Sequence, residues 1–165
     1  MAVVTGQQAG FAGGPLHNVY KAVSAIKLAQ HLSQTTGKAV VPVFWIASED
    51  TNVEQINAST WMDRQGQLRH IRADLGRMQQ QICNLPVQEA AMEAFEQLAQ
   101  MMPQSEFRSQ WQGVYEPRAS EPWGQWFGRI YARLFAEQGL VLLEPYVVYK
   151  GAGQIFRRII ASLKI

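Results

Sequence analysis

The sequence predicts an α/β fold in which a parallel sheet carries helices on both faces. Two observations predict it. Residues 2–47 run as a short apolar strand, a glycine-rich turn, a helix and a second apolar strand, which is the order of a βαβ unit. The second strand is a continuous apolar run, as expected for a central parallel strand that is covered on both sides.

The first strand and the turn after it form the most distinctive segment. Ala2–Thr5 reads as a buried strand that Gly6 ends, and Gly10, Gly13 and Gly14 follow within nine residues. Glycines at this density let the backbone adopt unusual angles and approach a ligand closely. Pro15 then suits the first turn of a helix.

The helix of the βαβ unit is predicted over residues 18–34. An apolar residue recurs at helical spacing, and Gly37 is placed to end the helix. The predicted buried face consists of Val19, Ala22, Val23, Ile26 and Ala29.

The second strand is predicted over residues 39–47. Pro42 has no N–H to donate and should therefore lie near the start of the strand or at an unpaired position. Ser48, Glu49 and Asp50 follow at the carboxyl end, where ligands bind in open α/β sheets.

The remainder of the chain is predicted to be mainly helical. A helix could begin at 53–57, 67–72 reads as a short strand, 113–122 is rich in turns, and 140–143 reads as a third strand. Helices are predicted over 87–102, 123–138 and 154–164. We therefore expect a single domain over 1–165 with a helical insertion, about 76–138, between strands.

Composition excludes several classes of function. The formal net charge is only +2, which is too balanced for a nucleic-acid-binding domain. The single cysteine, Cys83, allows no internal disulfide and fits a reducing cytoplasm. No apolar stretch approaches the roughly 20 residues of a membrane-spanning helix, so we expect no membrane association.

The loop 6–14 is the first candidate for chemistry. It matches neither the P-loop pattern nor the Gly-x-Gly-x-x-Gly fingerprint. Free loop amides and a helix N-terminus still favour an anion, so the loop is either a phosphate site or a flexible connection. Gln7 and Gln8 add amide groups suited to a base, a ribose or an amino acid.

Polar residues near the loop extend this candidate site. Residues 14–20 weakly resemble the Gly-x-Leu-His-x-Gly-His element of class I nucleotidyltransferases: His17 matches its first histidine, while Val19 and Tyr20 replace its glycine and second histidine. Such histidines stabilise phosphate charge. Lys21 lies on about the same helical face as His17 and could also reach a phosphate.

The acidic pair Glu49 and Asp50 could bind a substrate amine, a ribose hydroxyl or Mg²⁺, or it could simply cap a helix. Trp45 is better explained as a core residue than as a stacking surface. His70 and Cys83 show no ligand spacing that would predict a metal site.

Two long stretches resemble the bacillithiol biosynthesis cysteine-adding enzymes, the BshC family. The resemblance is carried by Val3–Gly10, Gly14–Leu16, Tyr20–Ala22, Ala25–Ala29, Pro42–Asp50 and Ile56–Asn57. It continues more sparsely in 126–127, 134–135, 139–143 and 155–158.

The resemblance implies a Rossmann-like core related to class I nucleotidyltransferases and a ligase that joins L-cysteine to glucosaminyl-malate. It also implies an ADP- or ATP-type nucleotide and a possible homodimer. The catalytic residues expected on this basis are His17, Lys21, Glu49 and Asp50. The binding residues expected are Thr5, Gly6, Gln7, Gln8, Gly10, Gly13, Gly14, Asn18, Trp45 and Asn57.

The sequence also departs from the family pattern. Thr51 and Asn52 stand where the family has His-Asp, and Ala58 stands where it has a histidine. Family members are also several hundred residues long. Two alternatives to the ligase therefore remain: a nucleotide-binding remnant without catalysis, and an oligomerisation or partner module that uses unpaired sheet edges.

Overall fold

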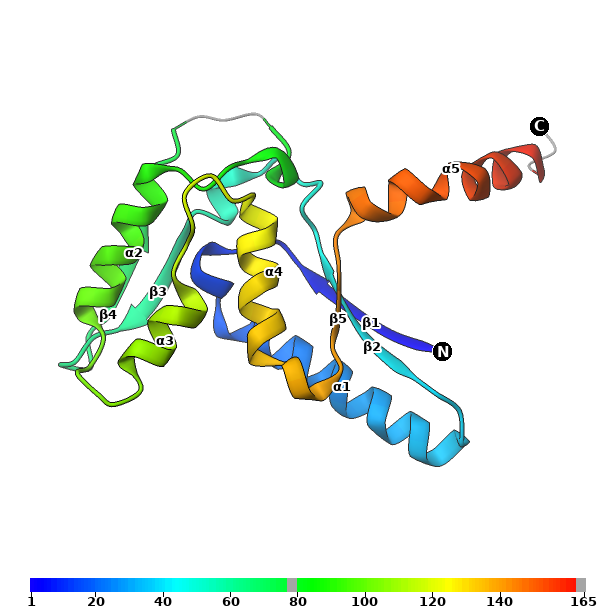
Figure 1. Ribbon diagram of the computed structural model, residues 1–165, viewed down its shortest axis with the longest axis horizontal. Helices are drawn as coiled ribbons and strands as arrows, with labels where there is room; N and C mark the ends of the chain where they lie inside the picture. The colour runs from blue at the N-terminus through cyan, green and yellow to red at the C-terminus, as the bar shows by residue number, and fades with distance from the viewer. Residues whose placement is uncertain (77–79, 163–165) are drawn as a thin grey trace.

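The computed structural model describes residues 1–76 and 80–162 (Figure 1). Three parallel strands form one sheet in the order β1-β2-β5, and two antiparallel strands form a separate hairpin, β3-β4. The parallel sheet with its helices confirms the predicted α/β class. No helix in the described part of the chain is long and apolar enough to cross a membrane.

The predicted βαβ unit is confirmed. It consists of β1 (Ala2–Gln7), α1 (Leu16–Thr36) and β2 (Val41–Ile46), and β1 pairs with β2 from Ala2 opposite Val41 to Gln7 opposite Ile46. Gly37 ends α1 in the left-handed conformation with φ of 65°. Pro42 is the second residue of β2, close to the strand's start as expected.

The helices α1 and α4 (Trp123–Leu134) pack on the same face of the sheet, not on opposite faces. The centroids of the Phe44 ring and the Tyr131 ring of α4 lie 5.1 Å apart, so this face of β2 packs against α4. Thr5 pairs with Phe44 and therefore points to the same face, where it lies against α1 beside Ala25. The strand order explains this arrangement. The connection from β1 to β2 and the connection from β2 to β5 move across the sheet in the same direction. Right-handed crossovers therefore place α1 and α4 on one side of the sheet.

The opposite face of the sheet is left largely uncovered by the residues described. Val4, Val41 and Val141 are 62%, 41% and 44% exposed, and Trp45 is only half-buried. In the described part of the chain, helices therefore cover one face of this sheet, whereas the sequence predicted helices on both faces. Val23 was wrongly assigned to the buried side of α1, since it is 38% exposed.

The long insertion between β2 and β5 (Val141–Leu143) begins with the hairpin and continues with helices. Before α4 it contains η2 (Val53–Gln55), β3 (Ala58–Met62), β4 (Leu68–Arg72), η3 (Ile82–Asn84), α2 (Glu89–Met101) and α3 (Arg108–Tyr115). The helix expected from 53 is only a 3-10 turn, and β3 and α3 were not predicted.

The chain ends in α5 (Pro145–Ser162), which points away from the rest of the structure in Figure 1. This helix starts nine residues before the predicted Gln154. The predicted end at Lys164 lies outside the described residues. Between α4 and β5, the 3-10 turn η4 (Ala136–Gln138) leads to Gly139, which adopts the left-handed conformation at the position expected for a helix stop.

The aromatic core lies between the sheet and α4, and it directly supports the glycine loop. The fully buried side chains include Phe11 from the loop, Phe44 from β2, and Trp123, Trp126, Phe127 and Tyr131 from α4. The Phe11 ring meets the Trp126 ring edge-on at 5.5 Å. Folding of the core therefore fixes where the loop sits.

Candidate functional site

The glycine loop requires its glycines. Gly13 and Gly14 have φ of +88° and +74°, which disfavour a side chain. A Cβ at Gly10 would lie 2.7 Å from Gly14 Cα, and one at Gly6 would lie 2.6 Å from the Trp45 carbonyl oxygen. The loop is thus a specific, closely packed structure and not a loose connection.

Hydrogen bonds from distant elements hold the loop in place. Trp123 Nε1 donates to the Ala9 carbonyl at 2.6 Å, and the Tyr131 hydroxyl donates to the Gly13 carbonyl at 3.1 Å. The Phe11 N–H donates to the Ile56 carbonyl at 2.7 Å. The loop is therefore pre-organised, which reduces the entropic cost of binding a ligand.

Asn18 lies directly beneath the loop. Its side chain is fully buried, and neither its amide nitrogen nor its amide oxygen has a hydrogen-bond partner among the described residues. Its Nδ2 would be only 2.5 Å from a Cβ at Gly14. An unsatisfied buried amide costs about 1–3 kcal/mol, so the position of Asn18 beside the loop requires an explanation, of which a functional role is one.

The N-terminus of α1 carries no acidic residue in its first turn and no side-chain cap. Its amide groups therefore face the loop without a negative partner. A helix of 21 residues has the positive end of its dipole here, which favours an anion.

Four of the predicted residues form a polar chain along the carboxyl ends of β1 and β2. Lys21 Nζ donates to Gln7 Oε1 at 2.6 Å and to the Gly6 carbonyl at 3.3 Å. Gln7 Nε2 donates to Gln8 Oε1 at 3.0 Å, and Gln8 Nε2 donates to Asp50 Oδ2 at 2.8 Å. The hydrogen bond from Gln8 is the main reason that the pKa of Asp50 lies below its ordinary value.

The side chains of the other predicted residues do not join this chain. His17 is exposed in the first turn of α1, where it lines a shallow depression with Thr5 and Lys21. Trp45 lies half-buried on the open face of the sheet. Asn57 is buried and donates to the Ala73 carbonyl at 3.1 Å, so it joins β3 to the end of β4. Glu49 is half-buried beside Asp50.

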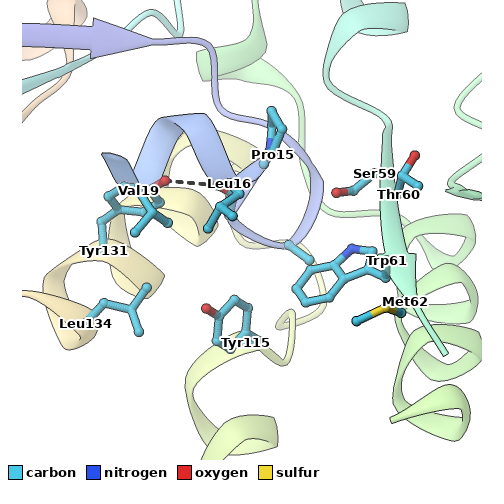
Figure 2. A pocket seen from close by; sticks show the side chains of 13 residues that line it. Pro15, Leu16, Val19, Ser59, Thr60, Trp61, Met62, Tyr115, Tyr131 and Leu134 are labelled. Carbon is cyan, nitrogen blue, oxygen red and sulfur yellow. Dashed lines mark hydrogen bonds between the residues drawn. The ribbon is translucent and has the colours of Figure 1, made fainter. Parts of the chain in front are cut away.

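An apolar pocket of about 290 Å³ opens on the other side of the loop (Figure 2). Gly13, Gly14, Pro15 and Leu16 form one wall, and the aromatic rings of Trp61, Tyr115 and Tyr131 form much of the rest. Figure 2 shows the Tyr115 hydroxyl pointing toward the space beside Leu16 and Leu134. No charged side chain lines this pocket.

Trp61, whose side chain lines the pocket, has an unused hydrogen-bond donor. Its indole N–H is buried and has no acceptor in the part of the chain that the structure describes. Its ring packs edge-on against Trp111 and Tyr115, with centroids 6.5 and 6.3 Å away. Sequence reasoning missed this pocket because Trp61 lies on β3 and Tyr115 on α3, the two elements that were not predicted.

Sequence reasoning placed Ser48 at the carboxyl end of the second strand without assigning it a role, and it missed Glu144. Glu144 directly follows β5, and Glu49 lies three residues after the end of β2. The rule that ligands bind at the carboxyl ends of parallel strands, applied to the third predicted strand, would have found it.

Comparison with known proteins identifies the family to which this fold belongs. The model of the N-terminal Rossmann-like domain of bacillithiol biosynthesis BshC matches residues 1–161. The chain belongs to the BshC family. Its Rossmann-like fold, expected from the resemblance, is thereby confirmed.

Curated BshC relatives show the same similarity at moderate identity. One from Heliobacterium modesticaldum, named "Putative cysteine ligase BshC", is 36% identical over 150 residues, which cover 88% of this chain and 27% of the relative. Relatives of the same name are 33% identical in Carboxydothermus hydrogenoformans and 34% identical in Koribacter versatilis, over 95% and 98% of this chain. In each case the chain spans less than a third of the BshC relative.

Proposed function

We propose that this BshC-family domain provides the nucleotide site of a cysteine ligase that joins L-cysteine to glucosaminyl-malate. The observation that carries the proposal is the aromatic pocket, which opens onto the glycine loop and the start of α1. The neutral pocket can hold the base, and the helix N-terminus beside it can hold the phosphates. This combination suits an ADP- or ATP-type nucleotide.

The nucleotide phosphates would lie at the loop and the first turn of α1. Gly10, Gly13 and Gly14 allow the backbone to come close to the phosphates, and Asn18 lies against Gly14 beneath them. His17 and Lys21 would stabilise the phosphate charge from the exposed side of α1. The base would enter the pocket against the Trp61 ring.

The polar chain would hold the substrate to be activated. Gln7, Gln8 and Asp50 lie at the carboxyl ends of β1 and β2, where their amide and carboxylate groups can bind a polar substrate. Thr5, Gly6, Glu49, Trp45 and Asn57 complete the proposed site residues, with Trp45 and Asn57 in supporting positions. Small-molecule substrates, a cytoplasmic location and a homodimer belong to the same proposal.

Binding is tested by thermal unfolding of the 165-residue protein with ADP, adenosine and pyrophosphate. A ligand of the native state raises the melting temperature, and we expect the largest shift with ADP. Gly14→Val should abolish every shift. Trp61→Leu should reduce the shifts with ADP and adenosine but leave the shift with pyrophosphate. Leu68→Ala, at an exposed position on the same hairpin, should change none of them.

Catalysis is tested separately. The protein is incubated with L-cysteine, glucosaminyl-malate and a nucleotide, beside a full-length BshC relative, and the product is measured by mass spectrometry. Product from both supports the ligase. An ADP shift without product, when the relative is active, favours the alternative in which the altered residues Thr51, Asn52 and Ala58 leave a nucleotide-binding remnant.

A further inference from the structure

A second cluster of polar groups lies where β2 and β5 end. Trp45 pairs with Leu143, so Glu144 lies level with Ile46 on the neighbouring strand. Ser48 and Glu49 follow Ile46 by two and three residues. Residues 48 and 144 thus meet at the carboxyl edge of the sheet, and Glu49 lies next to them.

Each of these three residues has an oxygen without a partner. Ser48 Oγ, Glu49 Oε2 and Glu144 Oε2 are buried and make no hydrogen bond to any residue that the structure describes. Ser48 is fully buried. The Ser48 hydroxyl lies close enough to Glu144 to lower the pKa of its carboxyl group, but one hydroxyl proton cannot satisfy both carboxylates. Burying a carboxylate oxygen without a donor is costly, so the cluster can accept a further donor.

The electrostatic environment of the cluster is negative. Burial is the main cause of the raised pKa of Cys83, and the charges of Glu144 and Glu49 raise it further. Burial also raises the pKa of Glu144, an effect that the nearby Ser48 hydroxyl partly offsets. Lys21, the lysine of the polar chain, donates to Gln7 and to the Gly6 carbonyl and not to this cluster.

The fold makes room for Glu144 at this edge. A Cβ at Gly124, in the first turn of α4, would lie 2.5 Å from Glu144 Oε2 and 3.2 Å from Ser48 Cβ. Glycine at 124 therefore allows the carboxylate to sit beside the start of α4 and next to Ser48. Any larger residue would push Glu144 out of the cluster.

We propose that Glu144, together with Glu49 and Ser48, binds the primary ammonium group of an amine substrate. An ammonium group presents three N–H donors, and the cluster offers three oxygen acceptors and two negative charges. The inference deepens the proposed ligase function, on which it rests for the choice of amine. Both the amino acid and the amino sugar of that reaction carry a primary amine.

The test uses pairs of compounds that differ only in this group. L-Cysteine is compared with N-acetyl-L-cysteine, and glucosamine with N-acetylglucosamine, by calorimetric titration of the 165-residue protein with a reductant present. We expect at least one free amine to bind, its acetylated partner not to bind, and the pair that responds to identify the source of the ammonium group.

Variants assign the binding to the cluster. Glu144→Gln keeps the shape but removes the charge, and it should weaken binding of the amine at least tenfold. Glu137→Gln, at an exposed position in the turn before β5, should bind as the unmodified protein does. Unchanged affinity in Glu144→Gln, equal binding of the acetylated compounds, or binding of Mg²⁺ alone that Glu144→Gln abolishes would each overturn the proposal.

The ADP shift separates this inference from the proposed function. If ADP stabilises both the unmodified protein and Glu144→Gln while no amine binds, the ammonium site is wrong and the nucleotide site stands. If an amine binds through Glu144 and ADP does not bind, the ammonium site stands and the proposed nucleotide site is wrong. Retention of the ADP shift in Glu144→Gln also shows that the variant is folded.

Discussion

Gln8 and Asp50 connect the ends of two neighbouring strands through a hydrogen bond of 2.8 Å from Gln8 Nε2 to Asp50 Oδ2. Gln8 also donates to Gln55 Oε1 at 2.6 Å, so its side chain ties the loop after β1 to the segment after β2. This single amide positions both the glycine loop and the acidic pair of the proposed substrate site.

We expect Gln8→Ala to raise the pKa of Asp50 toward its ordinary value of 3.8, because the hydrogen bond from Gln8 is the largest cause of the lowered pKa. Carboxyl ¹³C NMR titration would measure it. The stabilisation from Asp50 is present above pH 3.8 and is lost as pH falls through the lower pKa of the folded state. Gln65→Ala, in the turn between β3 and β4, is the control and should leave this titration unchanged.

Gly14→Ala should destabilise the protein more than Gly66→Ala does. Both glycines have positive φ, +74° and +75°, so both variants carry backbone strain of about 1–3 kcal/mol. Only at Gly14 does the new Cβ also meet a neighbour, Asn18 Nδ2, at 2.5 Å. Urea unfolding measures the difference, and equal losses for the two variants would contradict the close packing of the loop.

Trp123→Phe should loosen the glycine loop. It removes the donor to the Ala9 carbonyl and leaves that carbonyl buried without a partner, at a cost of about 1–3 kcal/mol. Hydrogen exchange at the Gly10 and Phe11 amides should accelerate relative to the unmodified protein. In Trp111→Phe, which alters a ring on α3, those two amides should remain protected even if the helix itself exchanges faster.

Glu144→Gln should make the protein more stable at neutral pH. Burial raises the pKa of Glu144, so its charged form is disfavoured in the folded state. The folded state then binds more protons than the unfolded state between the two pKa values, and stability falls as pH rises through that interval. Denaturant unfolding at pH 4 and pH 7 should therefore show a gain for the variant that is larger at pH 7. A loss of stability at pH 7 would show that the carboxylate has a structural partner.

Much of the βαβ unit could be predicted because its signals are local. The continuous apolar run of β2, the glycines of the loop and Gly37 after α1 each fix a local conformation. The strand β3 could not be found in this way, because Ala58–Met62 has no run of β-branched residues and is defined by its pairing with β4. The helix α3 contains Gly113, and its last three residues fall in the stretch 113–122 that looks rich in turns, so packing of Trp111 and Tyr115 decides its conformation.

The candidate site, too, could be predicted only where its residues are close to the loop or to a strand end in sequence. Gln7, Gln8, Lys21 and Asp50 were predicted because they adjoin the loop or a strand end in sequence. The pocket was not predicted, since its walls come from the glycine loop with α1, from β3, from α3 and from α4, which are far apart along the chain. The uncovered face of the sheet was missed for a related reason: the direction of the second crossover depends on strand order, which no local pattern encodes.

The placement of α1 and α4 on one face has a consequence for how this domain tolerates change. Along β2, Phe44 and Ile46 are buried, whereas Val43 and Trp45 are partly exposed on the other side. Tolerance to polar substitution should therefore alternate residue by residue along the strand. A deep mutational scan of the 165-residue protein would show this alternation. Polar substitutions should be tolerated least at Phe44 and Ile46, because these side chains face the hydrophobic core.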